Sequence, residues 1–194
     1  MIPLLKLDAA CMGWSSPILG PLSLTLQAGE ILGIQGPNGV GKSTLLSAIT
    51  GVAKVFSGQL EIASGTRMAL QTQQMPHVEG LPLNGHELLA LTNSLPGGLP
   101  SPLLAVLDER LDRLSGGQRQ FLCLWAVLNS PADLILLDEP SNNLDATGSA
   151  YLASALRARA AQGAGIVLVS HEQSLLAAAC DRCIECGVES QDKV

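Results

Sequence analysis

One stretch of nine residues governs the predicted architecture: Gly36-Pro37-Asn38-Gly39-Val40-Gly41-Lys42-Ser43-Thr44. It fits the pattern G-x-x-x-x-G-K-[ST], in which glycines let backbone N–H groups converge on phosphate oxygens. An apolar run over 31–34 predicts a buried strand before it, and a helix is expected over 42–50 after it. The start of a helix adds positive potential, Lys42 can reach the outer phosphates, and Ser43 offers Mg²⁺ a hydroxyl. The stretch therefore predicts a site for a nucleoside triphosphate, with contacts from Gly36, Asn38, Gly39, Gly41, Lys42, Ser43 and Thr44.

A second apolar run ends in two carboxylates, as Leu134-Ile135-Leu136-Leu137-Asp138-Glu139. Four consecutive apolar residues are typical of a strand that is buried on both faces in a parallel sheet. Ligands bind at the carboxyl edge of such sheets, so Asp138 is suited to hold Mg²⁺ and Glu139 to polarise an attacking water. Alone, this strand could simply end in solvated acids. Beside a phosphate loop, the two acids favour hydrolysis of the nucleotide over binding alone.

The remaining periodicity indicates alternating strands and helices. Apolar and polar residues alternate over 4–10 and 22–27, which predicts half-buried antiparallel strands. Further strands are expected near 58–63, 67–72 and 166–170. Helices are expected over 86–91, around Leu103, Leu107 and Leu111 just before residue 114, and over 117–128, 146–161 and 173–179. This order predicts an α/β fold with a mainly parallel sheet.

Length and charge limit the classes of function. The 194 residues suit one domain or at most two small ones. The 17 acidic residues outnumber the 11 basic ones, which argues against binding driven by nucleic-acid phosphates. Only 14% of residues are charged, so we expect part of the surface to be covered by a partner. No apolar stretch approaches the ~18 residues of a membrane span, and residues 1–6 do not resemble a secretory leader. We therefore expect a cytoplasmic protein, without a disulfide framework.

The stretch Leu114-Ser115-Gly116-Gly117-Gln118 lies between the phosphate loop and the acidic strand. In isolation it could be a helix N-cap. In this place it resembles the signature of the ATP-binding-cassette (ABC) ATPases. The resemblance covers essentially the whole chain, because further motifs match in the family's order: Trp14, the Q-loop glutamine Gln73, the D-loop Ser141-Asn142-Asn143-Leu144-Asp145 and the switch histidine His171.

The resemblance implies the fold and the roles within one chain. It implies a P-loop NTPase fold in which a small antiparallel β subdomain and a short helical subdomain, inserted over about 74–130, join the central sheet of a single domain, 1–194. Trp14 would stack on adenine, and Gln73 would join Ser43 and Asp138 as a Mg²⁺ ligand. The catalytic residues would be Glu139, His171 and Lys42, acting on ATP.

The resemblance also implies partners. Two copies would pair head to tail around ATP, so that Ser115, Gly117 and Gln118 of one copy contact the nucleotide held by the other. Asp145 would link the two sites. Integral-membrane permease subunits, and in some systems a substrate-binding protein, would complete a transporter, with this chain on the cytoplasmic face and no nucleic acid bound.

Some positions leave alternatives open. Trp14 could be an ordinary core aromatic, and the Q-loop register could fall on Gln71 or Gln74 in place of Gln73. Where the family usually carries arginines, this chain has Phe121 and Ala126. Phe121 and Trp125, four residues apart on a helix, are expected to pack in the helical subdomain. The triplet Cys180, Cys183 and Cys186 could be small buried side chains or an incomplete thiolate metal site.

The branch of the family also leaves alternatives. The short connection Ser64–Arg67 and the segment Gly80–Leu83 resemble zinc and manganese importer ATPases. The pair Asn142-Asn143 and the stretch Ser170-His171-Glu172 resemble the translation-factor branch, whose members carry two cassettes and a charged linker. The main hypothesis is a transporter subunit with a metal ion as cargo. The alternatives are a soluble ATPase acting on a machine such as the ribosome, and a regulatory cassette that does not hydrolyse ATP.

Overall fold

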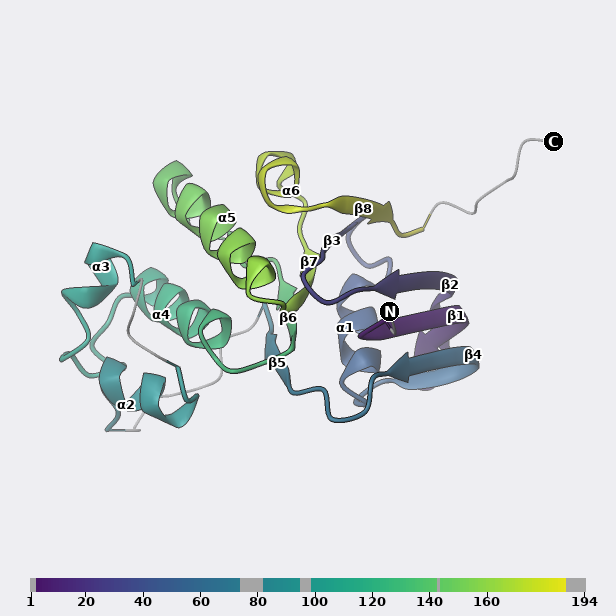
Figure 1. Ribbon diagram of the computed structural model, residues 1–194, viewed down its shortest axis with the longest axis horizontal. Helices are drawn as coiled ribbons and strands as arrows, with labels where there is room; N and C mark the ends of the chain where they lie inside the picture. The colour runs from purple at the N-terminus through teal and green to yellow at the C-terminus, as the bar shows by residue number, and fades with distance from the viewer. Residues whose placement is uncertain (1–2, 74–81, 95–98, 143, 188–194) are drawn as a thin grey trace.

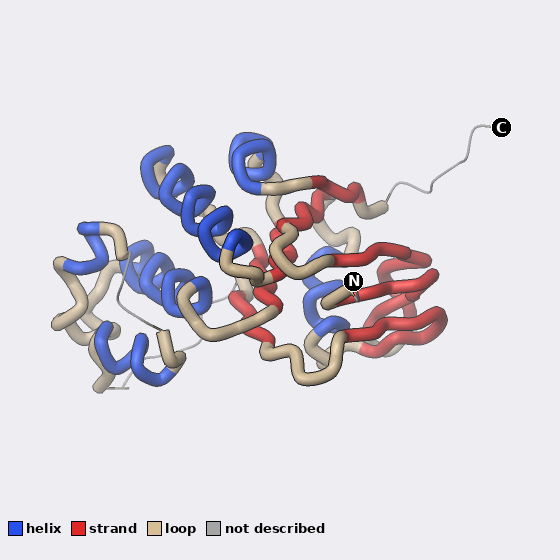
Figure 2. Tube along the Cα trace, viewed as in Figure 1, coloured by secondary structure: helices blue, strands red, loops and turns tan. Residues whose placement is uncertain are grey.

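The computed structural model describes residues 3–73, 82–94, 99–142 and 144–187. Its centre is a five-stranded parallel sheet in the order β5-β6-β7-β3-β8 (Figures 1 and 2). The strands are β3 (Ile31–Gln35), β5 (Met68–Gln71), β6 (Leu134–Asp138), β7 (Gly165–Val169) and β8 (Arg182–Glu185). All four neighbouring pairs are parallel, with Ile31 beside Ile166 and Leu134 beside Gly165. The predicted α/β class with a mainly parallel sheet is confirmed.

A smaller antiparallel sheet lies beside the first, in the order β2-β1-β4. Its strands are β1 (Leu5–Gly13), β2 (Pro17–Leu26) and β4 (Lys54–Ile62). These strands are longer than the segments 4–10, 22–27 and 58–63 predicted from sequence. Irregular pairing between the strands interrupts the alternation of apolar and polar residues on which that prediction rested. Between Asp8 and Cys11 the pairing shifts register, and Ala9 there has φ 44°. Gly58 packs against this bulge, where a β-carbon would lie 2.3 Å from the Ala9 carbonyl oxygen.

Alternate residues of the central strands enter two cores. Leu134 and Leu136 of β6 pack with helix α1 (Lys42–Ile49) and the antiparallel sheet. Ile135 and Leu137 pack on the opposite face, against the remaining helices. Of these, α4 (Gly116–Leu128) and α5 (Ala146–Ala161) contact the strands, and α6 (Gln173–Ala179) places Leu176 against Gly33 of β3. Both faces are therefore covered, which explains why the central strands are continuously apolar.

The segment before α4 corrects one prediction. It contains α2 (Gly85–Leu91) and the one-turn helix α3 (Ser101–Leu104), so the prediction of a helix carrying Leu103, Leu107 and Leu111 is wrong beyond Leu104. All three leucines are buried. The Leu107 carbonyl, however, accepts from Gly85 N–H at 2.8 Å, and Leu111 N–H donates to the Leu83 carbonyl at 2.8 Å. These bonds across the segment replace helical ones, and residues 74–81 and 95–98 of the expected insertion lie outside the described ranges.

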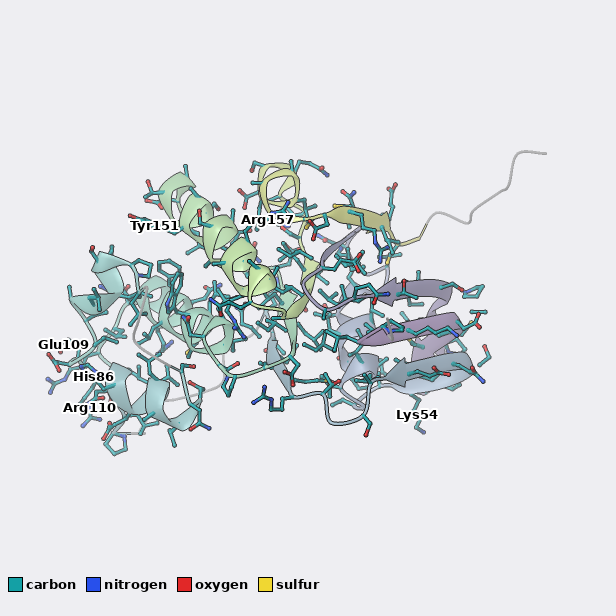
Figure 3. The ribbon with its side chains drawn as sticks, viewed as in Figure 1. Lys54, His86, Glu109, Arg110, Tyr151 and Arg157 are labelled. Carbon is teal, nitrogen blue, oxygen red and sulfur yellow. The ribbon has the colours of Figure 1, made fainter. Side chains whose placement is uncertain are left out.

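Side chains reinforce the outer elements. On α4, the rings of Phe121 and Trp125 meet edge to face, with centroids 5.9 Å apart, and Trp125 is buried. Arg157 projects from α5 (Figure 3) and donates to the Asp181 carboxylate at 2.5 Å and to the Cys180 carbonyl at 3.0 Å. This joins α5 to the start of β8. Within the described ranges, the structure contains no helix with the length and apolar character that crossing a membrane requires.

Candidate active site

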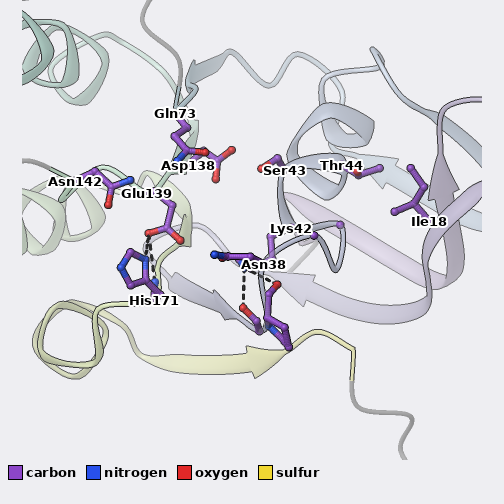
Figure 4. Close-up of a pocket in the computed structure, with 14 residues that line it drawn as sticks. Ile18, Asn38, Lys42, Ser43, Thr44, Gln73, Asp138, Glu139, Asn142 and His171 are labelled. Atoms are coloured by element: carbon purple, nitrogen blue, oxygen red, sulfur yellow. Dashed lines mark hydrogen bonds and ion pairs between the residues drawn. The ribbon is translucent and has the colours of Figure 1, made fainter.

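A cavity of about 680 Å³ opens where β3 and β6 end and α1 begins (Figure 4). This is the carboxyl edge of the parallel sheet, where ligands of α/β proteins bind, and the volume is in the range of small-molecule sites. Its lining includes eleven of the residues predicted from sequence, namely Gly36, Asn38, Gly39, Gly41, Lys42, Ser43, Thr44, Gln73, Asp138, Glu139 and His171. The topology thus brings the phosphate loop, the acidic strand, the Q-loop residue and the switch histidine to one place.

The phosphate loop wraps around the Lys42 ammonium. Lys42 Nζ donates to the Gly36 carbonyl at 2.7 Å and to the Pro37 carbonyl at 3.0 Å, and only 7% of the residue is exposed. Gly36 has φ 146°, and a β-carbon there would lie 2.5 Å from the Cys186 carbonyl oxygen. Gly41 begins α1 with φ 105°, and no described side chain caps the helix. The first N–H groups of α1 therefore lack intrahelical acceptors and line the cavity, an arrangement suited to phosphate.

Asp138 lies opposite the phosphate loop and is 6% exposed. Burial raises its pKa above the ordinary value, while a hydrogen bond with Ser43 opposes the rise. Nearby Glu139 raises the pKa further, and Lys42 lowers it. The Ser43 hydroxyl, the Asp138 carboxylate and the Gln73 amide, which lines the same cavity, are the oxygen donors that Mg²⁺ takes. The chemistry of this donor set fits a magnesium ion bound beside phosphates.

Glu139 and His171 form a close pair between the ends of β6 and β7. His171 Nδ1 lies 2.7 Å from Glu139 Oε2, which also accepts from the His171 backbone N–H at 3.3 Å. Glu139 is buried and has φ 50°, a conformation that a non-glycine residue rarely takes. Its own N–H donates to the Val169 carbonyl at 2.9 Å. The sharp turn after β6 thus directs a buried carboxylate into the cavity beside an imidazole.

Five predicted nucleotide contacts do not line this cavity, namely Trp14, Ser115, Gly117, Gln118 and Asp145. Trp14 is 47% exposed in the turn between β1 and β2. Ser115 and Gln118 form a capping box at the start of α4, with bonds of 3.2 and 3.0 Å. Gly117 is exposed, and apart from its chain neighbours and the backbone of its own helix, no described atom lies within 4 Å of where its β-carbon would be. Asp145 caps α5 by accepting from Gly148 N–H at 2.7 Å.

The three glutamines near the end of β5 have different surroundings. Gln73 lines the cavity. Gln71, in the strand, is 5% exposed, and neither end of its amide has a partner among the described residues. Gln74 lies outside the described residues, as does Asn143 of the D-loop. Of the two described candidates, only Gln73 reaches the cavity.

Sequence reasoning missed three residues of the lining: Ile18, Pro37 and Asn142. Pro37 and Asn142 lie inside motifs that were recognised, so proximity to their neighbours could have identified them. Ile18 carried no such signal, because it is an apolar residue outside every motif and outside the strands expected from sequence. In the structure it is 49% exposed beside the phosphate loop, with Cγ2 3.3 Å from the β-carbon position of Gly41.

The cysteine triplet divides between two environments. Cys180 and Cys183 place their sulfurs 2.9 and 2.6 Å from the β-carbon position of Gly33, so the two thiols lie side by side over that glycine. Cys186 is buried in the other core, with Leu32 and Ile34. Burial raises the pKa of Cys180 to about 12, and the neighbouring Cys183 adds to the rise. Among the described residues there is no group of three or more metal-ligating side chains, and Cys183 is exposed while Cys180 is half-buried.

Comparisons with known proteins agree on one family. Residues 19–84 match the family model described as ABC transporter. Zinc import ATP-binding protein ZnuC of Marinobacter nauticus is 33% identical over 189 residues, covering 94% of this chain and 74% of that protein. Vitamin B12 import ATP-binding protein BtuD of Escherichia coli is 39% identical over 183 residues, covering 79% of this chain and 71% of that protein.

Solved structures show the same fold. A structure of the ATP-binding subunit of an ABC transporter aligns with a TM-score of 0.79 at 23% identity, covering 94% of this chain and 85% of that one. A structure described as an inward-facing conformation of a metal-chelate type ABC transporter aligns with a TM-score of 0.77 at 23% identity, covering 96% of this chain and 80% of that one.

Proposed function

This chain belongs to the ABC transporter ATP-binding family, and we propose that it binds and hydrolyses ATP to power a transporter. The observation that carries the proposal is one cavity in which Lys42 and the start of α1 lie opposite the buried acids Asp138 and Glu139. Cationic and N–H donors suit the phosphates, and the acids suit the metal ion and the attacking water. The same cavity therefore holds the groups for binding and for hydrolysis.

Binding would begin at the phosphate loop. The β- and γ-phosphates would take the place of the Gly36 and Pro37 carbonyls as acceptors for Lys42, and would also accept from the first N–H groups of α1. Ser43, Asp138 and Gln73 would hold Mg²⁺, which when bound supplies positive charge to the phosphate oxygens. Trp14, and Ile18 beside the loop, offer apolar surface for the adenine.

Hydrolysis would use the pair Glu139 and His171. The Glu139 carboxylate would accept a proton from a water as the water oxygen bonds to the γ-phosphorus, while the bond from that phosphorus to the bridging oxygen breaks and ADP leaves. His171, whose side chain is mostly exposed and lines the cavity, would donate to the γ-phosphate. Because His171 Nδ1 now lies 2.7 Å from Glu139, a γ-phosphate that draws the imidazole away would free the carboxylate for water.

A second copy would complete each site. Ser115, Gly117 and Gln118 lie outside the cavity of their own chain and are exposed at the start of α4. Docked on a second copy, they would present a hydroxyl, an N–H group and a helix start to its γ-phosphate. Asp145, near the end of the D-loop, would connect the two sites. The chain is then a single cassette, 1–194, with the helical insertion over about 74–130 carrying the signature.

The cargo that we propose is a metal ion. Relatives that share about a third of their residues with this chain are named zinc import ATP-binding proteins, and others are named for vitamin B12. Integral-membrane permease subunits would hold the chain on the cytoplasmic face, and a substrate-binding protein would deliver the ion. Affinity purification of the chain from membranes of its own cell should recover a multi-span permease. Recovery of ribosomal proteins instead would contradict transport.

Replacing Glu139 by glutamine tests hydrolysis. Glu139→Gln keeps the size of the side chain and removes the base, so we expect ATP binding to persist and turnover to fall by at least ~100-fold. With its ATP uncleaved, the variant should remain a dimer in light scattering. Glu61→Gln on exposed β4 is the matched control and should behave as the parent. Turnover of Glu139→Gln at the parent rate would overturn the role of Glu139, and a parent that does not hydrolyse ATP would overturn the function.

A further inference from the structure

Glu172 directly follows His171 and begins α6, yet its side chain does not cap that helix. The carboxylate turns to three serine hydroxyls. Ser174 Oγ donates to Oε1 at 2.9 Å, and Ser149 Oγ, on α5, donates to Oε2 at 3.4 Å. The third hydroxyl is that of Ser141, whose interaction with the carboxylate is the first cause of the lowered pKa of Glu172.

These hydroxyls keep Glu172 charged. The bond from Ser141 lowers the pKa of Glu172 below its ordinary value, burial opposes the shift, and Ser174, Ser149 and His171 add to it. Ser141 is only 7% exposed, so its hydroxyl has little access to water as an alternative partner. The carboxylate is therefore an acceptor for the hydroxyl of a largely buried residue.

Two of the three serines, Ser141 and Ser149, lie in or directly after the loop that follows β6, whereas Ser174 lies on α6 beside Glu172. Ser141 lies two residues after Glu139, and its carbonyl accepts from Leu144 N–H at 2.9 Å, which shapes the D-loop. Ser149 lies in the first turn of α5, directly after that loop. Glu172 lies in the loop after β7, beside His171. Its carboxylate therefore forms a second bridge between the two loops that carry Glu139 and His171, outside the cavity lining.

We propose that Glu172 is a positioning residue that holds the loop after β6 and the loop after β7 in register, so that Glu139 and His171 meet the γ-phosphate together. The inference rests on the proposed ATP hydrolysis. Glu172 does not touch the nucleotide. Without Glu172, the side chains of Glu139 and His171 are still present, but the contact that fixes the two backbones is lost. Small misplacements of reacting groups lower the catalytic rate more than they weaken substrate binding.

Steady-state kinetics of Glu172→Gln test the proposal. The amide keeps the volume of the side chain but has one acceptor in place of two and no charge. We expect kcat for ATP to fall about tenfold, with KM changed less than about twofold. Ser141→Ala removes one of the two hydroxyls that join Glu172 to the far side of the bridge and should also lower kcat, and the double variant with Glu172→Gln should be no worse than Glu172→Gln alone. Glu172→Gln combined with Glu139→Gln should still trap an ATP-bound dimer.

Ser174→Ala is the matched control, because it removes a hydrogen bond to the same carboxylate within α6 alone. It should retain the parent kcat. If Glu172 served only to stabilise α6, then Ser174→Ala and Glu172→Gln would lower the melting temperature alike and leave kcat unchanged, which would overturn the proposal. Should Glu172→Gln fail to fold, an unchanged kcat in Ser141→Ala would overturn it equally. A parent without turnover overturns the proposed function and this inference together; an active parent with an equally active Glu172→Gln overturns the inference alone.

Discussion

The Lys42 ammonium donates to two carbonyls of its own loop, and in the proposed complex the phosphates would take their place. Lys42→Ala removes the cation and leaves the loop backbone intact. Since a hydrogen bond to a charged group contributes about 1.5–3 kcal/mol, ATP affinity should fall by roughly 10–100-fold. Equilibrium titration with a fluorescent ATP analogue measures this, with Lys54→Ala on exposed β4 as control. Equal affinities of Lys42→Ala and the parent would exclude the loop as the phosphate site.

Position 33 must be a glycine because two thiols pack directly over its α-carbon. A β-carbon there would lie 2.6 Å from Cys183 Sγ, 2.9 Å from Cys180 Sγ and 3.0 Å from Leu176 Cδ2. Gly33→Ala should therefore lower the free energy of unfolding by about 1–3 kcal/mol in urea denaturation, as overpacking does. Cys183→Ala in the same chain should restore part of the loss, because it removes the nearest obstacle. If the double variant is as unstable as the sum of the single ones, the thiols do not set this requirement.

At the scale of elements, Asp133 joins the starts of β5 and β6. Its carboxylate accepts from the Arg67 guanidinium at 2.9 and 3.0 Å and from the Arg67 backbone N–H at 2.9 Å. These hydrogen bonds lower its pKa to about 2. A carboxylate with a lowered pKa stabilises the folded state above the unfolded value near 4, and this stabilisation is lost as the pH falls toward 2.

Asp133→Asn should therefore lower the melting temperature at pH 7, and the difference from the parent should vanish near pH 2. Because the pair is largely exposed, we expect a shift of less than about 4 °C. Melting curves between pH 2 and pH 7 test this, with Asp8→Asn on β1, which is exposed, as control. A difference that persists unchanged at pH 2 would show that the charge of Asp133 is not its cause.

The bounds of a helix or strand could be predicted from sequence where its contacts are local. They were missed where hydrogen bonds to segments distant in the sequence determine the structure. The helix over 146–161 has the predicted bounds, because its cap Asp145 and its regular pattern lie within one stretch. The chain after Leu104 leaves the helix because its carbonyl and N–H groups bond to Gly85 and Leu83, which no local pattern contains. For the site, contiguous motifs predicted the phosphate loop and the acidic strand. The approach of Ile18 to the loop depends on how two sheets pack, and it left no trace in the sequence.

At the scale of the whole molecule, the proposed site is divided between two copies, and mixing two inactive variants tests this. Lys42→Ala disables the phosphate loop, and Gly117→Asp places a negative charge at the exposed start of α4. Gly117→Asp should fold, because no described atom beyond its chain neighbours and its own helix backbone lies within 4 Å of the β-carbon position. Each variant alone should show little ATP turnover, because every site in its dimers has one defective half.

In a mixture of equal amounts, half of the dimers would contain one chain of each kind. Such a dimer pairs the intact phosphate loop of Gly117→Asp with the intact signature of Lys42→Ala, which rebuilds one of its two sites. The mixture should therefore regain roughly a quarter of the parent turnover if the two sites act independently. Parent-like turnover of Gly117→Asp alone would show that the signature does not serve a partner's nucleotide. A mixture that hydrolyses no faster than its separate components would argue against head-to-tail sites, since pairing is then unable to combine the two intact halves.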